Sequence, residues 1–77
     1  MGKATEKIIK KCKAHGIEIN INDRELCTIL ERFDDMCEIR PMSDGGVRVA
    51  YNFGAVSKDL IIHKDGKYSY SEGIGFM

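Results

Sequence analysis

The spacing of hydrophobic residues changes once along this chain, near residue 37. Before that position, apolar residues recur every three or four places, which is the period of an amphipathic helix. After it, they recur at every second place, which is the period of a strand with one buried face. The pattern therefore predicts helices in the first half of the chain and an antiparallel sheet in the second half.

A first helix is expected over residues 4–15, because apolar residues share one of its sides and lysines the other. The apolar side comprises Ala4, Ile8, Ile9 and Cys12. Gly16 is well placed to end the helix in a left-handed conformation. Isoleucines alternate over residues 17–21, so this segment is expected to be extended or a short strand.

A second helix is expected over residues 23–36. Asn22 is the predicted N-cap, Glu25 completes a capping box, and Ile21 is expected to pack on Leu26. The apolar stripe of this helix comprises Leu26, Ile29, Leu30, Phe33 and Cys37. The side chains expected on its opposite, solvated face are Glu31, Asp35 and Glu38.

The glycine-rich run over residues 43–46 has two interpretations, a phosphate-binding loop or the tip of a hairpin. It lacks the Lys-Ser/Thr pair and the following helix of a phosphate-binding loop. A three-residue loop over residues 44–46 would pair Ile39 with Tyr51, which places the apolar residues on one face. We therefore predict a hairpin tip.

A second hairpin is predicted around Asp65-Gly66, taken as a two-residue type I′ turn. That turn pairs Ile61 with Tyr70 and His63 with Tyr68, with residues 54–59 as the connection from the first hairpin. Both faces of this hairpin would then be partly apolar. An exposed face carrying Tyr68 and Tyr70 suggests a protein contact, the alternative being aromatics that are exposed without a function.

Together these elements predict one α+β domain over residues 1–77. Two N-terminal helices would pack on one face of an antiparallel sheet made of two β-hairpins, as a two-layer sandwich. No apolar stretch approaches the roughly 20 residues that a membrane span requires, and no secretory signal is present. We therefore expect a cytoplasmic protein with reduced cysteines and no membrane partner.

The net charge is zero, but its distribution is uneven. Residues 1–16 contain five lysines and one glutamate, whereas residues 18–38 contain seven acidic residues and two arginines. The lysine face of the first helix could contact nucleic-acid phosphates, although it lacks the side chains that read bases. The acidic segment could dock on a basic groove, or could be balanced by the lysines of the same chain.

Candidate catalytic and metal-binding groups are few. Cys12, His15, Cys27 and Cys37 could be drawn as a zinc set, but Cys27 and Cys37 lack the close spacing of structural zinc ligands. Neither a metal nor another cofactor is expected. A reactive Cys27 would require a base within hydrogen-bond reach, and no motif supplies one. The chain is also too short to spare apolar residues for a substrate pocket, so an enzyme is not expected.

The leading hypothesis is a non-enzymatic module that binds a larger protein. Its size resembles that of phage or mobile-element inhibitors, which suggests a nucleic-acid-handling protein as the target. The predicted contact residues are Glu31, Asp35, Glu38, Tyr68 and Tyr70. The alternatives are a nucleic-acid-binding accessory protein that uses the lysine face, and a thiol-dependent protein that uses Cys27. The pattern predicts no oligomeric state.

Overall fold

The computed structural model describes residues 4–34 and 36–74. It contains two helices followed by four strands, and the strands form one antiparallel sheet in the order β1-β2-β3-β4. The elements are α1 (Thr5–Ala14), α2 (Arg24–Leu30), β1 (Glu38–Pro41), β2 (Val47–Phe53), β3 (Val56–Ile62) and β4 (Tyr68–Ile74). The predicted α+β class is confirmed. Within the described ranges, no helix is long and apolar enough to cross a membrane.

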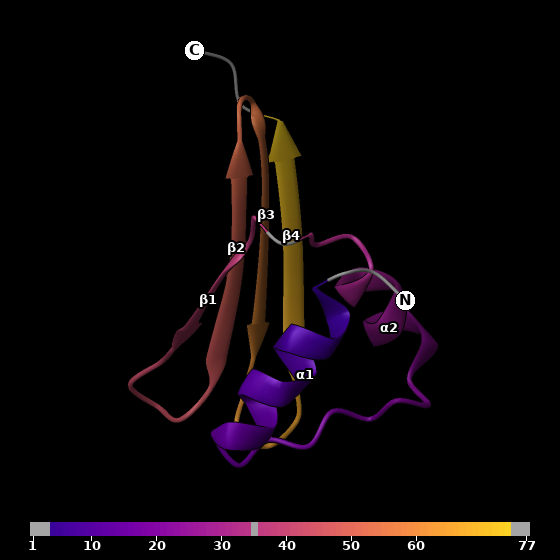
Figure 1. Cartoon of the computed structure of the whole chain (residues 1–77), viewed down its shortest axis with the longest axis vertical. Coiled ribbons are helices and arrows are strands. Elements are labelled where there is room, and N and C mark those ends of the chain that lie inside the picture. The colour runs from indigo at the N-terminus through magenta and orange to yellow at the C-terminus, as the bar shows by residue number, and fades with distance from the viewer. Residues whose placement is uncertain (1–3, 35, 75–77) are drawn as a thin grey trace.

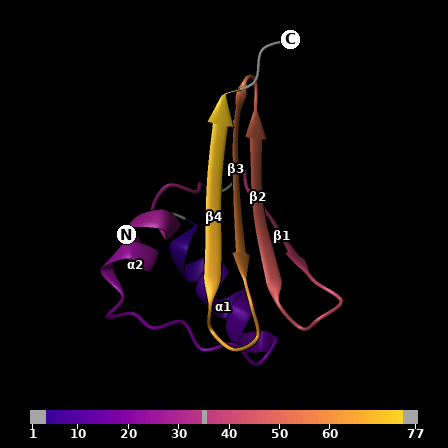
Figure 2. The same ribbon diagram turned by 180° about the vertical axis from the view of Figure 1, so that it is seen from behind.

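The helices lie near one end of the strands. Figure 1 shows α1 in front of the lower part of the sheet and α2 on the β4 side. Seen from behind, the sheet lies in front of α1, and the upper parts of β2, β3 and β4 extend past both helices (Figure 2). Part of the sheet therefore has no helix beside it.

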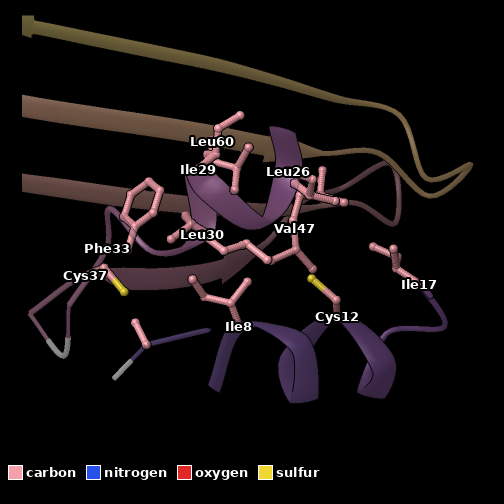
Figure 3. Packing of buried hydrophobic residues seen from close by; sticks show 13 residues of the cluster. Ile8, Cys12, Ile17, Leu26, Ile29, Leu30, Phe33, Cys37, Val47 and Leu60 are labelled. Atoms are coloured by element: carbon pink, nitrogen blue, oxygen red, sulfur yellow. The ribbon is translucent and has the colours of Figure 1, made fainter. Parts of the chain in front are cut away.

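The hydrophobic core joins the helices to the two central strands. Figure 3 shows Ile8 and Cys12 reaching from α1 toward Val47, with Leu30 of α2 beside them. The buried apolar residues are Ala4, Ile8, Cys12, Ile17, Leu26, Ile29, Leu30, Phe33, Cys37, Val47, Val49, Leu60 and Ile62. This cluster contains the apolar sides predicted for both helices, except that Ile9 is only partly buried.

The first helix agrees with its prediction, and the segment after it does not form a strand. Gly16 has a φ of 82° and ends α1, while the Ile17 amide donates to the Cys12 carbonyl at 2.9 Å. Ile17 is buried, but Ile21 is 71% exposed. Residues 17–20 therefore belong to no helix or strand, and Ile21 lies in a turn that the Asp23 amide closes by donating to the Asn20 carbonyl at 3.1 Å.

The predicted start and length of the second helix are wrong. Asp23, not Asn22, is the N-cap, because its carboxylate accepts from the Leu26 amide at 3.1 Å. The predicted capping box does not form, because the residue three places after Asp23 is Leu26, which has no side-chain acceptor. The Ile21 side chain is exposed and does not cover the start of the helix as predicted. The helix ends at Leu30, since the Phe33 amide donates to the Leu30 carbonyl three residues back, as in a tight 3₁₀ turn.

The first hairpin has a three-residue loop, but this loop lies one residue earlier than predicted. The Met42 amide donates to the Gly46 carbonyl at 2.8 Å, which leaves residues 43–45 as the loop. Gly45 takes the left-handed position with a φ of 92°, and the Asp44 carboxylate accepts from the Gly46 amide. Ile39 consequently pairs with Val49 instead of Tyr51.

This displacement changes the register by two residues, so the apolar residues keep the predicted face. Its physical cause is the close approach of Gly46 to β3. A Cβ atom on Gly46 would lie 2.6 Å from the Ile62 carbonyl oxygen. Gly46 therefore belongs beside the strands, and Gly45 alone supplies the turn.

The predicted type I′ turn of the second hairpin is wrong. Asp65 does not have a positive φ, and only Gly66 does, at 92°. The His63 amide donates to the Lys67 carbonyl at 2.7 Å, which makes a three-residue loop like that of the first hairpin. The register shifts by one residue, so Tyr68 pairs with Ile62 and Tyr70 with Leu60.

A shift of one residue moves every side chain of a strand to the opposite face. Tyr68 and Tyr70 therefore lie on the same face as buried Leu60 and Ile62, not on the far face. This is the largest correction to the predicted structure, because the proposed tyrosine contact depended on the other register.

The segment expected to connect the hairpins is part of the sheet. Residues 56–59 belong to β3, and Phe53 pairs with Val56 across a two-residue turn. Gly54 has a φ of 60° and Ala55 does not have a positive φ, which is the pattern of a type II′ turn. The sheet is thus a continuous meander.

Candidate functional site

The candidate zinc ligands Cys12, His15, Cys27 and Cys37 do not form a metal-binding cluster within the described residues. Over residues 4–34 and 36–74, no group of three or more His, Cys, Asp or Glu side chains could hold a metal ion. Cys12 is buried in the core, and burial raises the pKa of its thiol to about 11. A thiol in this environment stays protonated at neutral pH and serves as an apolar core residue.

Cys27 is the one cysteine that is only partly buried. It lies on α2, and its thiol donates to the Ile21 carbonyl at 3.4 Å. This contact is with the backbone and provides no base that would activate the sulfur. A chemical role for Cys27 therefore remains a prediction without a structural partner to support it.

The predicted acidic helix face is not a single helix face. Glu31 is exposed at the C-cap of α2, whereas Glu38 is the first residue of β1 and forms an ion pair with Arg40 at 2.7 Å. Asp35 lies outside the described residues. The helical spacing that grouped these three acids ends at Leu30, so that part of the prediction is wrong.

The two tyrosines of β4 contact the elements on the helix side of the sheet. The Tyr68 hydroxyl donates to the Asp23 carboxylate at 3.2 Å. Tyr70 packs edge-on against Phe33, with ring centroids 6.2 Å apart. Both side chains are half-buried, and they join β4 to α2 and the turn that follows it. A contact of these tyrosines with a partner stays a prediction.

Arg32, Tyr70 and Glu72 form a polar cluster beside these aromatics. The Tyr70 hydroxyl donates to Glu72 Oε2 at 2.8 Å, and Arg32 Nη1 lies 3.3 Å from the same carboxylate. The tyrosine hydrogen bond and the Arg32 charge hold the pKa of Glu72 below its ordinary value. The cluster therefore favours the folded state at neutral pH, and this contribution is lost as the pH falls through that lowered pKa.

Beyond this cluster, the same face of the sheet carries an uncovered apolar row. We call Phe53, Val56 and Ile74 the distal row, because they pair directly across β2, β3 and β4 at the strand ends that extend past the helices. Their exposed fractions are 61%, 40% and 71%. Val56 and Ile74 also line a surface hollow together with Glu72 and Gly73.

Lys58 marks the boundary between the covered and the uncovered parts of this face. It pairs with Tyr51 and Glu72 on the neighbouring strands. Its ammonium donates to the Arg32 carbonyl at 2.7 Å and lies 4.9 Å from the centre of the Tyr51 ring. These contacts hold the Lys58 charge against the protein instead of leaving it extended into solvent.

The lysine face of α1 is also on the surface. Its members are exposed, and none of them forms an ion pair within the described residues. The side chains are those of Lys7, Lys10, Lys11 and Lys13. This face is separate from the distal row, since it lies on α1 and the distal row lies on the strands.

The distal row is not part of the sequence-based prediction, because that prediction treats residues 54–59 as a connection and not as part of a strand. A signal was present in the sequence: alternation continues from Val47 to Phe53 and resumes at Val56 with Leu60 and Ile62. Two such runs separated by a glycine-containing pair are the pattern of a hairpin.

Comparison with known proteins found no matching family model, no similar curated protein and no similar solved structure.

Proposed function

We propose that this chain is a non-enzymatic protein-binding module that contacts a larger protein through the distal row. The observation that carries the proposal is the exposure of three apolar side chains in one continuous row across three strands. Exposed apolar patches bordered by polar residues are typical of protein interfaces. Phe53 would serve as an aromatic anchor of the kind that contributes most to such contacts.

The proposal takes the domain as a two-layer sandwich in which both helices cover one face of the sheet. The shared core of both helices with Val49 and Leu60 supports this layout. In that arrangement the distal row is the uncovered continuation of the core face. A partner would extend the helix layer over it.

The charges at the border of the distal row support an apolar partner surface. Glu72 is already paired with Arg32, and Lys58 already donates to a backbone carbonyl. Neither group needs a counter-charge from the partner. The partner surface that fits is therefore mainly apolar, with a polar rim, as in other protein interfaces.

The narrower hypothesis of a phage or mobile-element inhibitor of a nucleic-acid-handling protein has weaker support. It relied on an acidic face that imitates phosphates, but Glu38 is paired with Arg40. Glu31 remains as an exposed acid at the end of α2. We retain this hypothesis as a separate outcome of the experiment below.

A non-enzymatic role is supported by the state of the titratable groups. General acid–base pairs owe their tuned pKa values to burial. The ion pairs within the described residues are at least partly exposed, and the one strongly shifted thiol, Cys12, is inside the core. These groups suit a structural role better than catalysis.

Binding of nucleic acid by α1 is the second candidate. Its support is the exposed lysine face, whose four ammonium groups could each contact a phosphate. Such binding would weaken steeply with salt and would discriminate little between sequences. Replacement of Lys7, Lys10 and Lys13 by Glu would abolish it and would leave the distal row intact.

The test is a comparison of two isoleucine variants that differ in position but not in exposure. Ile74 and Ile21 are both 71% exposed, but only Ile74 belongs to the distal row. Proteins retained by the immobilised wild-type chain would be identified, and their affinities would be measured by titration. We expect Ile74→Ser and Phe53→Ser each to weaken the binding of a true partner tenfold or more, roughly the effect of losing an interface anchor.

Ile21→Ser should retain the partner at wild-type affinity. Equal retention by every variant would contradict the distal row as the contact surface. Loss only in a Glu31→Lys, Glu38→Lys variant would restore the acidic hypothesis in its place. Circular dichroism of each variant would establish that binding is compared between folded proteins.

A further inference from the structure

The sheet ends in a long edge at β4. Sheet edges in natural proteins are usually blocked by short strands, charges, prolines or bulges. The other edge is blocked in this way, because β1 has four residues and contains both Arg40 and Pro41. In contrast, β4 has seven residues in continuous register without lysine, arginine or proline, and its one charged residue, Glu72, is paired with Arg32. No described strand lies beyond it.

The outward-pointing backbone groups of β4 can be assigned from its pairing with β3. The His63 amide donates to the Lys67 carbonyl, so this is a hydrogen-bonded pair. Such pairs alternate along an antiparallel ladder, so Ser69 and Ser71 also direct their backbone groups toward β3. Tyr68, Tyr70, Glu72 and Ile74 consequently direct theirs toward the open edge.

A second β4 strand, antiparallel to the first, fits this edge in a full-length register centred on Ser71. In that register Tyr70 lies opposite Glu72 of the other copy, and Tyr68 lies opposite Ile74. Both are pairs of residues with outward-pointing backbone groups, as antiparallel hydrogen bonding requires. All seven residues of β4 find a partner.

The side chains are complementary in the same register. The Tyr70 hydroxyl already donates to Glu72 within one chain, and each Glu72 keeps its own Arg32. Ile74, 71% exposed in the single chain, would lie beside the Tyr68 ring of the other copy. On the face of the sheet opposite to the distal row, the paired residues would be small, since they are Ser69, Ser71 and Gly73.

Neighbouring registers of the two β4 strands give less favourable side-chain pairs. Centring the pair on Glu72 places two carboxylates directly opposite each other, which is destabilising. Centring it on Tyr70 leaves Ile74 without a partner. Only the Ser71 register continues the distal row of one copy into the Tyr68 and Ile62 row of the other.

We propose that two copies of this chain associate through antiparallel pairing of their β4 strands around Ser71, which forms one eight-stranded sheet. The contact is isologous, as in most homodimers, because the same strand serves both copies. This inference concerns the edge of β4 and does not depend on the proposed binding of a larger partner. The distal rows of the two copies stay on the same face of the joined sheet.

The test places a cysteine on the symmetry axis. Ser71 would face its own copy across a non-hydrogen-bonded pair, with Cα atoms about 4.5 Å apart, within reach of a disulfide. In a Cys27→Ser background, we expect Ser71→Cys to form a covalent dimer under mild oxidation. Ser69→Cys is the matched control. In this register the Ser69 positions of the two copies are offset by four residues, which is about 13 Å along the strands.

Sedimentation of the wild-type chain gives an independent measurement. We expect a concentration-dependent monomer–dimer equilibrium, which Ser71→Lys weakens about fivefold because two lysines would face each other. Within one chain, the introduced lysine would lie opposite Asp59, so the fold should be retained. Ser69→Lys should leave the equilibrium unchanged.

Three results would overturn the proposal. The first is a wild-type chain that remains monomeric up to about 1 mM, the limit of weak association. The second is a dimer in which Ser69→Cys crosslinks as well as Ser71→Cys. The third is a dimer that Ser71→Lys leaves unaffected. Failure of the distal-row experiment with an intact β4 dimer would reject only the proposed function.

Discussion

Replacement of Phe33 by alanine is expected to lower the free energy of unfolding by about 3–5 kcal/mol, the usual range for a buried phenylalanine. Phe33 is 1% exposed and lies after the end of α2, where it contacts Tyr70 of β4. Its removal would leave a cavity in the core beside Tyr70. Urea denaturation followed by circular dichroism would measure the effect.

Phe53→Ala is the matched control, because the same atoms are removed from a side chain that is 61% exposed. Its effect on stability should stay within about 0.5 kcal/mol, as for most surface substitutions. Equal losses in the two variants would contradict the distinction between the core and the distal row. A loss of stability confined to Phe53→Ala would mean that Phe53, and not Phe33, is the core residue.

Gly46→Ala should destabilise the protein by about 1–3 kcal/mol, the usual range for overpacking. The added Cβ atom would lie 2.6 Å from the Ile62 carbonyl oxygen, which is a backbone atom that cannot rotate away. The first hairpin would have to separate from β3, or the strands would have to shift. Thermal unfolding measured by calorimetry would report the loss.

Gly73→Ala provides the comparison, since its Cβ atom would meet only the Ser57 hydroxyl at an ordinary 3.7 Å. We expect little change in its melting temperature. If Gly46→Ala proved equally harmless, the close approach of the first hairpin to β3 would be wrong. The displaced loop would then lack its physical cause.

The sequence was sufficient for the features that depend on local periodicity. The first helix, its end at Gly16 and the apolar residues of both helical segments follow from spacing alone. The end of the second helix did not follow, because Phe33 and Cys37 continue the helical spacing after the chain has turned at Leu30. Both residues are buried in the core, so their spacing resembles that of a helix although the helix has already ended.

The register of the second hairpin was harder to predict because Asp-Gly suits two kinds of turn. Both a type I′ turn and a three-residue loop place glycine in the left-handed region. The choice depends on the φ of the aspartate, which the sequence does not specify directly. Asp44 and Asp65 each accept a hydrogen bond from the amide two residues later, and this supports the three-residue loop in both hairpins.

The candidate site was less predictable than the fold. A ten-residue helix is about 15 Å long, whereas a seven-residue strand spans about 23 Å. The uncovered length of sheet depends on this difference and on where the helices pack. Sequence periodicity identifies the apolar face of a strand, but not how much of that face the helices reach.

The central claim is that the apolar face of the sheet, with Tyr68 and Tyr70 on it, continues past the helices as the distal row. The most direct measurement is a set of cross-strand nuclear Overhauser effects in the folded protein. We predict Hα–Hα contacts between Leu60 and Tyr70, and side-chain contacts that link Phe53 to Val56 and Val56 to Ile74. An Hα–Hα contact between Ile61 and Tyr70 instead would place the tyrosines on the opposite face and contradict the account.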